Sequence, residues 1–406
     1  MRLHDHLLQH DMYKQHQSAY RKSHSTETAL VRVQSDILRA MDHKKATILV
    51  LLDLSAAFDT IDHELLLERL TQCGISGTAL SWFRSYLNER SQKVLLRGAS
   101  SESSSLKYGV PQGSVLGPIL FTIYTIPLGE ICRRHGVEYH LYADDTQLYV
   151  SFKVSDEVEL IEAQRRIEMC IKEIKAWMVM FMLKLNDDKT ELVIIASPFY
   201  HQCNQIPLSH VQVGDVGINP SKSARNIGVM FDQQIYMVSQ VTRMCQAAWF
   251  QLRNIRAVRS SLTREATLKL VCSLVMPRLD YGNISLYGVA ESLLDKLQRV
   301  QNAAGRLVVQ CPRTDHITPV LYDLHWLPIR SRIMYKMLVT TFRALHHEAP
   351  AYITEMLIPY TPSRTLRSLN TALLTVPATS THYGDRAYSV AAPRMWNELP
   401  LKIKKC

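Results

Sequence analysis

The sequence lacks the marks of several protein classes. Its eight cysteines are scattered singly, with no Cys-x-x-Cys pair and no histidine at metal-ligand spacing, so neither a zinc site nor a disulfide framework is expected. Residues 1–10 contain no apolar signal segment, and the longest apolar run of the first domain, 46–54, is interrupted by Asp53 and is too short to span a bilayer. We therefore expect an intracellular, reducing location, in the nucleus, the cytoplasm or both, and no membrane partner.

Charge is distributed unevenly along the 406 residues, whose formal net charge is +10. Residues 1–220 carry 23 Lys and Arg against 26 Asp and Glu, whereas residues 221–350 carry 17 against 8. A basic region attracts a phosphate backbone, because neutralising phosphates releases condensed counterions. A solvated basic face is the other interpretation that charge alone leaves open.

The spacing of apolar residues predicts a chain that is mixed α and β up to about residue 235 and mainly helical beyond it. A continuous apolar run at 47–52 is typical of a strand buried on both faces. The other predicted strands lie at 92–97, 137–143, 146–151, 190–196, 208–213 and 226–231. Helices are predicted at 25–43, 63–72, 77–89, 115–128, 156–182, 238–258, 263–275, 291–309 and 330–346.

Three aspartates stand where a predicted strand ends or turns. Asp53 follows the strand at 47–52, and a carboxylate there must be paired or bind a cation to offset its desolvation. Asp144 and Asp145 join two strands rich in apolar and aromatic residues, at hairpin length. If the two elements are adjacent, three carboxylates converge in a way that suits two Mg²⁺ ions about 3.5–4 Å apart. Two other interpretations stay open, a capping or ion-pairing acid at Asp53 and an ordinary tight turn at 144–145.

Three segments resemble the palm motifs of reverse transcriptases, in the order and at the separations that these enzymes have. They are residues 51–59 (LLDLSAAFD), 109–118 (GVPQGSVLGP) and 142–145 (YADD). The variants present are similar to those of non-LTR (LINE-like) retrotransposons. Further segments at 281–283, 296–304, 324–329 and 386–393 look like the region that follows the polymerase in these elements.

The resemblance implies roles for the acidic and aromatic residues of these motifs. Asp53, Asp144 and Asp145 resemble the catalytic carboxylates that bind the metal ions. Phe58 resembles the steric gate, whose ring occupies the space that a ribose 2′-hydroxyl needs and so selects dNTPs. A phenylalanine of the protein core is the other interpretation of Phe58.

Four more residues are implied to bind the nucleotide. Gln112 and Gly113 resemble the loop that packs against the templating base and the incoming nucleotide, where glycine permits close approach of the backbone. Lys189 resembles the lysine near the β- and γ-phosphates, although a surface lysine is an open alternative. Arg21 resembles the fingers arginine that binds the triphosphate. Residues 224–232 (ARNIGVMFD) are similar to the primer-grip hairpin.

The family resemblance implies an α+β fold, the right-hand polymerase. Its expected parts are partial fingers and a palm with an antiparallel sheet at 1–235, a basic helical thumb-like region at 236–312, and a mostly α C-terminal region at 313–406 with no assigned role. The implied function is an RNA-directed DNA polymerase of retrotransposition, which transfers a nucleotide from dNTP to a primer 3′-hydroxyl with two Mg²⁺ ions, or Mn²⁺ in their place. Its partners would be an RNA template and a DNA primer or target. The sequence does not indicate the oligomeric state.

Other functional hypotheses remain open. Family members carry an endonuclease domain and the first fingers strands before the point where Met1 stands, so this chain corresponds to the C-terminal portion of a polyprotein. A truncated, inactive relic that only binds nucleic acid is therefore the alternative. An unrelated two-metal nuclease is a third hypothesis, but it leaves Phe58 and the loop at 112–113 without a purpose. A second acidic pair, Asp187 and Asp188, is expected to be a structural turn between a helix and a strand.

Overall fold

The computed structural model describes residues 2–55, 57–202, 206–208, 210–214, 216–361 and 372–404. The strands are β1 (Lys45–Leu52), β2 (Leu54–Ser55), β3 (Arg90–Gln92), β4 (Leu95–Leu96), β5 (Ala99–Ser100), β6 (Ser104–Leu106), β7 (Glu138–Tyr142), β8 (Asp145–Lys153), β9 (Lys184–Leu185), β10 (Glu191–Ile195), β11 (Val211–Val213), β12 (Val216–Ile218), β13 (Ser223–Asn226) and β14 (Val229–Asp232). The helices of the first half are α1 (Arg2–Gln9), α2 (Thr26–Asp42), α3 (His63–Gln72), α4 (Gly77–Leu87), α5 (Gly117–Tyr124), α6 (Pro127–Arg134), α7 (Glu157–Met180) and α8 (Pro198–Gln202), with the 3₁₀ turn η1 (Asp187–Lys189).

Beyond β14 the described chain is mainly helical, as the apolar spacing predicts. The helices are α9 (Val238–Ala257), α10 (Arg264–Leu274), α11 (Met276–Asp280), α12 (Glu291–Val309), α13 (Ile317–Asp323), α14 (Ile329–Leu345), α15 (Ala351–Thr354), α16 (His382–Arg386), α17 (Tyr388–Glu398) and α18 (Leu401–Lys404). Two 3₁₀ turns, η2 (Arg259–Ser261) and η3 (Asn283–Leu286), lie between them. No described helix has the length and apolarity needed to cross a membrane.

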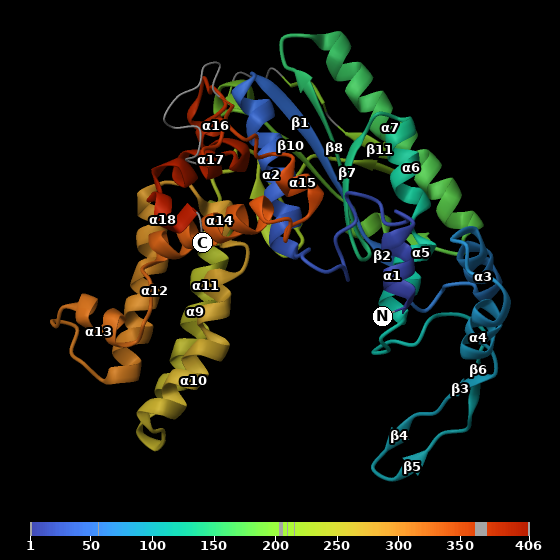
Figure 1. The fold of residues 1–406 in the computed structure, drawn as a ribbon, viewed down its shortest axis with the longest axis horizontal. Helices are drawn as coiled ribbons and strands as arrows, with labels where there is room; N and C mark the ends of the chain where they lie inside the picture. The colour runs from blue at the N-terminus through green and yellow to red at the C-terminus, as the bar shows by residue number, and fades with distance from the viewer. Residues whose placement is uncertain are drawn as a thin grey trace. The chain divides into compact units, whose positions relative to one another are not determined.

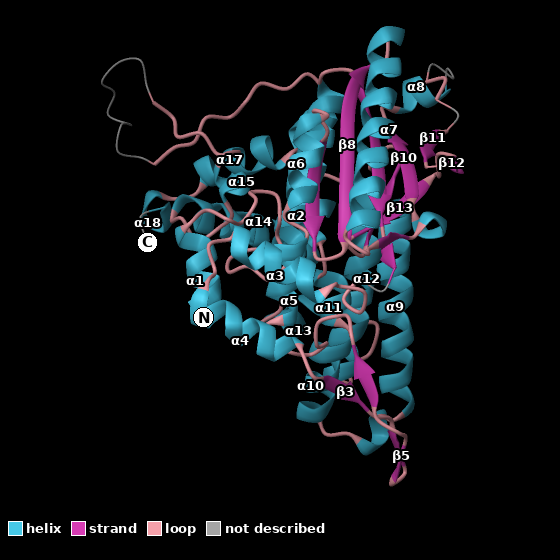
Figure 2. Cartoon of the chain, turned by 90° about the vertical axis from the view of Figure 1, so that its right-hand side faces the viewer, coloured by secondary structure: helices cyan, strands magenta, loops and turns pink. Residues whose placement is uncertain are grey.

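A four-stranded sheet has the strand order β10–β1–β8–β7. Along the chain, helices separate β1 from β7, a tight turn joins β7 to β8, and α7 leads from β8 to β10, which is a βαββαβ arrangement. The helical crossover keeps β7 parallel to β1, and the hairpin then reverses direction, so β8 is antiparallel to its neighbour β1. The helix α7 packs along β8 (Figures 1 and 2). The end of β1 therefore meets the start of β8.

The predicted buried strand is confirmed. Every residue of β1 after Lys45 is buried, which explains why its aliphatic run shows no alternation of apolar and polar side chains. The two helices with the clearest start signals are confirmed as well. Ser25 caps α2 in a reciprocal capping box with Thr28, and the Asp156 carboxylate accepts hydrogen bonds from two N–H groups in the first turn of α7.

The described chain divides into two compact units that do not follow the order of the sequence. Unit 1 comprises Met1–His24, Ile48–Leu192 and Ile206–Pro220, and unit 2 comprises Ser25–Thr47, Val193–Gln205 and Ser221–Cys406. The helix α2 thus belongs with the C-terminal half of the chain. The domain boundaries expected near 235 and 312 stay predictions.

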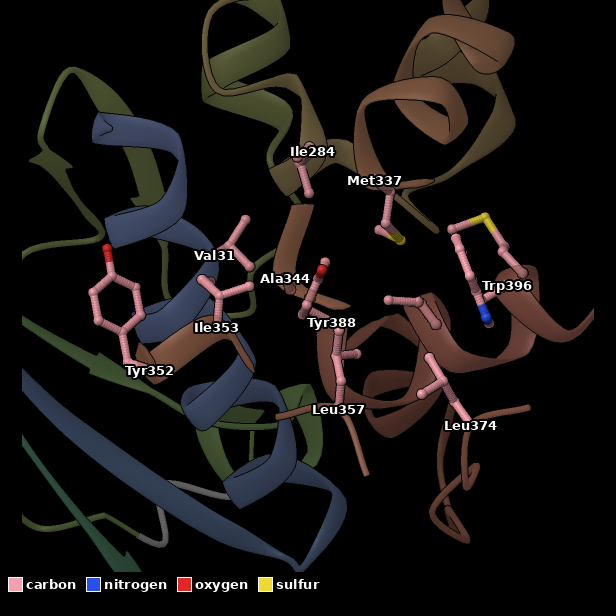
Figure 3. Packing of buried hydrophobic residues seen from close by; sticks show 13 residues of the cluster. Val31, Ile284, Met337, Ala344, Tyr352, Ile353, Leu357, Leu374, Tyr388 and Trp396 are labelled. Atoms are coloured by element: carbon pink, nitrogen blue, oxygen red, sulfur yellow. The ribbon is translucent and has the colours of Figure 1, made fainter. Parts of the chain in front are cut away.

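Unit 2 has its own apolar core, which joins α2 to the last helices of the chain. Val31 on α2 packs in one cluster with Met337 on α14, Tyr352 on α15, and Tyr388 and Trp396 on α17 (Figure 3). Buried hydrogen bonds reinforce the cluster, because the Tyr388 hydroxyl lies 3.1 Å from the Thr341 hydroxyl. The helices α15, α16 and α17 therefore pack on α2, a helix that precedes β1 in the sequence.

Three predicted elements differ from the structure. The strand expected at 92–97 is divided between β3 and β4, which pair with β6 and β5 in an exposed ribbon that projects beyond α4 (Figure 1). The helix expected at 115–128 is two helices, since α5 ends at Tyr124 and Pro127 starts α6. The strand expected at 226–231 is a hairpin, in which β13 and β14 pair around a turn at Ile227–Gly228. The strand expected at 208–213 falls partly on Ser209, outside the described residues.

Asp42, at the end of α2, provides a test of this packing. Its buried carboxylate accepts hydrogen bonds from the backbone N–H groups of Ser380 and Thr381, at 2.9 and 2.8 Å, and from the Thr381 hydroxyl at 2.9 Å. We expect Asp42→Ala to lower the free energy of unfolding by ~2–4 kcal/mol, because three donors lose the acceptor that they share at a buried position. Chemical denaturation measures this loss.

The control is Asp323→Ala, which removes an exposed carboxylate that pairs with Arg264. Exposed ion pairs contribute little, so its cost should stay within ~1 kcal/mol. Equal stability of the two variants would show that the C-terminal segment does not depend on Asp42.

Candidate active site

Asp53 lies directly after β1, at the point where the buried strand leaves the sheet. Its side chain is 29% exposed, and its Oδ2 atom accepts no hydrogen bond from the described residues. The nearest counter-charge is the Lys189 ammonium, whose Nζ lies 3.3 Å from Oδ2. A partly desolvated carboxylate whose oxygen accepts no hydrogen bond and faces an ammonium group is suited to a cation.

A local strand pair brings Lys189 to this position. The short strand β9 pairs with β2, with Leu54 opposite Leu185, and the Asn186 N–H then donates a 2.9 Å hydrogen bond to the Asp53 carbonyl. The chain turns through η1, which ends at Lys189. The neighbouring Asp187 pairs with Lys175 at 2.9 Å, in agreement with the structural role predicted for this second acidic pair.

Asp144 and Asp145 occupy the turn that joins β7 to β8. Tyr142 and Asp145 are the last pair of the ladder, so Ala143 and Asp144 form the turn itself. Ala143 has a φ of +55°, a left-handed conformation that costs an L-residue ~1–2 kcal/mol. The turn thus holds one acid at its tip and places the other at the first residue of β8, the strand next to β1.

The segment that precedes α2 approaches the same turn. Gln17 forms a parallel bridge with Leu141, and the Ser18 N–H donates a 3.0 Å hydrogen bond to the Leu141 carbonyl. Since this pairing is parallel, the residues that follow run in the same direction as β7, toward Asp144. Burial, together with the negative charge of Asp144, raises the pKa of Tyr20.

Arg21 lies in this segment, but its described contacts are with the protein backbone. Its Nη1 donates 2.8 Å hydrogen bonds to the carbonyls of Lys14 and Gln17, and its guanidinium lies 4.7 Å from the centre of the Tyr13 ring. These contacts fix the loop beside the Asp144 turn. The predicted contact of Arg21 with a triphosphate stays a prediction.

The loops that follow Asp53 and precede α5 are joined to each other. The Val110 N–H donates to the Phe58 carbonyl at 2.9 Å, and the Gln112 side-chain amide donates to Asp59 Oδ1 at 2.8 Å. Gly109 makes this approach possible. A Cβ atom at Gly109 would lie 2.9 Å from the Asp59 carbonyl oxygen and 3.0 Å from that of Phe58.

Phe58 packs on the helix α5. Its half-buried ring stacks on that of Phe121, with centroids 4.6 Å apart and an interplanar angle of 26°. Phe121 is fully buried, so the core determines the position of the Phe58 ring, which stays partly exposed. This stacking agrees with the interpretation of Phe58 as a residue of the protein core, and its role as a steric gate stays a prediction.

The structure gathers some of the predicted residues into two groups. Asp53 and Lys189 form one, and Phe58, Gln112 and Gly113 share the second through the joined loops. The sheet places Asp144 and Asp145 next to the strand that leads to Asp53. Among the described residues, however, no three His, Cys, Asp or Glu side chains are arranged closely enough to hold a metal ion.

Three supporting residues were not predicted from the sequence. Asp59 anchors Gln112, and Tyr20 lies near Asp144. The buried His63 ring is 2.8 Å from the Gly109 carbonyl oxygen, through Nε2, and so fixes the loop before α5. Only Asp59 lies inside a recognisable motif, because the other two act through contacts between distant segments.

Gly109 and Gly113 allow a matched test of the joined loops. Both have a positive φ, +87° and +77°, but a Cβ at Gly113 would meet no described atom within 4 Å. We expect Gly113→Ala to cost only the backbone strain, ~1–2 kcal/mol, and Gly109→Ala to cost a further ~1–3 kcal/mol through the clash. Denaturant unfolding of both variants measures the difference, and equal values would mean that the two loops are not in contact.

Comparison with known proteins agrees with this geometry. Residues 1–231 match the family model described as "Reverse transcriptase (RNA-dependent DNA polymerase)". Over 381 residues the chain is 27% identical to a probable RNA-directed DNA polymerase from transposon BS of Drosophila melanogaster, an alignment that covers 90% of this chain and 40% of that protein. It is 26% identical over 306 residues to the RNA-directed DNA polymerase from mobile element jockey of the same species, covering 73% of this chain and 32% of that protein.

The chain thus spans 40% or less of the length of these relatives. Among solved structures, a telomerase from Candida albicans in complex with a fragment of telomeric RNA has 13% sequence identity and a TM-score of 0.43, over 82% of this chain and 51% of that one. The family model covers more than half of the present sequence, including all three acids and the joined loops. This chain therefore belongs to the reverse transcriptase family, with RNA-directed DNA polymerases of non-LTR transposons among its relatives.

Proposed function

We propose that this chain is an RNA-directed DNA polymerase that extends the 3′-end of a DNA primer by copying an RNA template with dNTPs. The observation that carries the proposal is the position of Asp53 at the end of β1, beside the strand that begins at Asp145. In this assignment the sheet is the palm, the helices α3 and α4 with the exposed ribbon belong to partial fingers, and α9 to α12 form the thumb. Retrotransposition is the process in which such an activity would serve.

The residues of the site would have different roles in nucleotidyl transfer. Asp53, Asp144 and Asp145 would supply carboxylate oxygens, the ligand type that Mg²⁺ prefers. The Oδ2 atom of Asp53, which accepts no hydrogen bond from the described residues and faces the Lys189 ammonium, fits a cation. Bound divalent ions would activate the primer 3′-hydroxyl and stabilise the departing pyrophosphate. Lys189, 68% exposed, is free to exchange its contact with Asp53 for the phosphates of the nucleotide.

The joined loops would select and position the nucleotide. The partly exposed Phe58 ring would exclude a ribose 2′-hydroxyl, because its position is fixed by stacking on Phe121. Gln112, held by Asp59, and Gly113, with open space around it, offer a flat surface to the base pair. Arg21 would reach the triphosphate from the segment beside the Asp144 turn.

The decisive experiment is primer extension on poly(rA)/oligo(dT) with Mg²⁺, with Mn²⁺ as a second metal. We expect the chain to incorporate dTTP, both alone and when it is joined to the segment that precedes it in family members. Asp144→Asn should lower the rate of incorporation at least ~10³-fold, because the neutral amide binds the metal poorly. The control is Asp188→Asn, which alters the second acidic pair and should retain activity. If neither form of the wild-type chain incorporates dTTP, the polymerase assignment is wrong.

A groove between α9 and α12 favours a second candidate, a protein that binds nucleic acid without chemistry. Its lining has no acidic residue among those described, and it contains Trp249, 39% exposed. The cationic side chains that line this α9–α12 groove are Arg253, Arg256, Lys296, Arg299, Arg306 and Arg313. Phosphates attract such a lining, and a base can stack on an exposed indole.

Salt-dependent RNA binding tests the groove independently of catalysis. Lys296 and Arg299 are exposed and form no ion pair with described residues. We expect the double variant Lys296→Ala/Arg299→Ala to reduce the slope of log K against log salt by ~1.5. Lys269→Ala, which removes an exposed lysine of α10, is the control. Normal RNA binding by Asp144→Asn without extension would separate the two functions, and an unchanged slope in the double variant would exclude the groove.

A further inference from the structure

Arg386 is a buried cation in the part of the chain to which no role has been assigned. It is the last residue of α16, and only 5% of its surface is exposed. Burial lowers the pKa of its guanidinium, and the charges of Tyr383, Asp232 and Tyr236 act in the opposite direction. A buried guanidinium is stable only where it has hydrogen-bond acceptors and a compensating charge.

The acceptors of Arg386 come from two other segments of unit 2. Its Nη2 donates a 2.8 Å hydrogen bond to the Ile235 carbonyl, and its Nε donates to the Tyr287 carbonyl at 3.3 Å. Gly288, at a φ of +70°, leaves the space for this side chain, because a Cβ there would lie 2.5 Å from the Arg386 Cγ. The arginine thus connects α16 to the segment that follows the β13–β14 hairpin.

That segment, residues 233–237, connects β14 to α9, and we refer to it as the hairpin-base loop. Two of its residues, Ile235 and Met237, have φ values of +52° and +63°, which are unfavourable for L-residues. The Asp232 carboxylate holds the loop by accepting hydrogen bonds from three of its N–H groups, those of Gln234, Tyr236 and Met237. Such a conformation persists only when its surroundings determine it, and Arg386 supplies the partner for its Ile235 carbonyl.

The other end of the hairpin is also fixed. The Tyr281 hydroxyl donates a 2.8 Å hydrogen bond to the Ile227 carbonyl, in the turn between β13 and β14. A Cβ at Gly228 would lie 3.0 Å from the Tyr281 ring, and one at Gly282 would lie 2.7 Å from a methyl group of Val229. The β13–β14 hairpin is therefore held at its turn by residues 281–282 and at its base by Arg386.

We propose that Arg386 is a positioning residue, through which the C-terminal region fixes the β13–β14 hairpin for use by the polymerase. The hairpin resembles a primer grip, so its use in extension rests on the proposed function, whereas its fixation by Arg386 does not. In this view residues 379–396 are an integral part of the polymerase. They hold α2 through Asp42 and the hairpin-base loop through Arg386.

Hydrogen–deuterium exchange on the full chain tests the fixation without any need for activity. In Arg386→Met we expect the amides of residues 234–237 to exchange at least ~10-fold faster, because the loop loses its support. Arg386→Lys, which keeps the charge, should restore a large part of the protection. Arg394→Met is the matched control, since Arg394 is 44% exposed and pairs only with Asp385 among the described residues.

Steady-state primer extension tests the consequence for catalysis. We expect Arg386→Met to raise KM for the primer–template by ~10-fold while kcat changes by less than ~3-fold, because the site around Asp53 is untouched. Arg386→Lys should recover KM, and Arg394→Met should match the wild type. A general loss of folding would lower kcat in proportion to the folded fraction and would leave KM unchanged.

The outcomes separate the two proposals. If wild-type protein incorporates no dNTP, the proposed function fails, while the exchange result still decides whether Arg386 fixes the hairpin-base loop. If residues 234–237 exchange at the wild-type rate in Arg386→Met, or equally fast in Arg394→Met, the positioning role is wrong. If Arg386→Met fails to fold, Gly288→Ala provides a second test, because its Cβ would displace the Arg386 side chain. This variant must show the same faster exchange at residues 234–237.

Discussion

The burial of β1 inside its sheet is the constraint on which the rest of the site depends. A strand with neighbours on both edges and apolar contacts on both faces can place a polar side chain only where it leaves the sheet. Asp53 stands at that point, so its carboxylate loses part of its hydration. The same desolvation that would destabilise an unpaired acid increases its attraction for a cation. Lys189 supplies that positive charge in this structure, and a divalent ion would compete with it for the same oxygen.

The position of Phe58 and Gln112 depends on a close approach between two backbones. Gly109 lets the loop before α5 touch the loop after Asp53, and the contact then orients the side chains of Phe58 and Gln112. The motifs predict that both loops are functional, since their residues match those of a known family. They do not reveal the contact between the loops, because the partner of Gly109 lies 50 residues away. His63, which fixes the same loop, carries no motif and could be found only from the coordinates.

Local signals predicted most of the elements and few of the connections between them. The aliphatic run of β1 and the 3.6-residue spacing of the long helices each arise from neighbours in sequence, and each is confirmed. Apolar spacing predicted a single strand at 226–231, and only the family resemblance indicated a hairpin there, because its turn is Ile227–Gly228, not one of the common turn pairs. Ile227 adopts its φ of +39° with the Tyr281 hydroxyl bound to its carbonyl. A tertiary contact, and not the local sequence, thus stabilises this turn.

The grouping of α2 with the last helices also arises from tertiary contacts and not from the local sequence. Apolar spacing shows that α2 has a face to bury, but it does not show which segment covers it. In the structure, residues about 300 positions later cover this face of α2. Two buried charges of opposite sign, Asp42 and Arg386, determine which segment packs there. Asp42 accepts hydrogen bonds at the start of α16, and Arg386 donates them at its end, so a helix of five residues is fixed at both termini. Removing either charge would leave buried donors or acceptors unpaired, which costs more than the loss of apolar contact in so short an element. The contacts of Asp42 and Arg386 thus connect the last helices to α2 and to the hairpin-base loop.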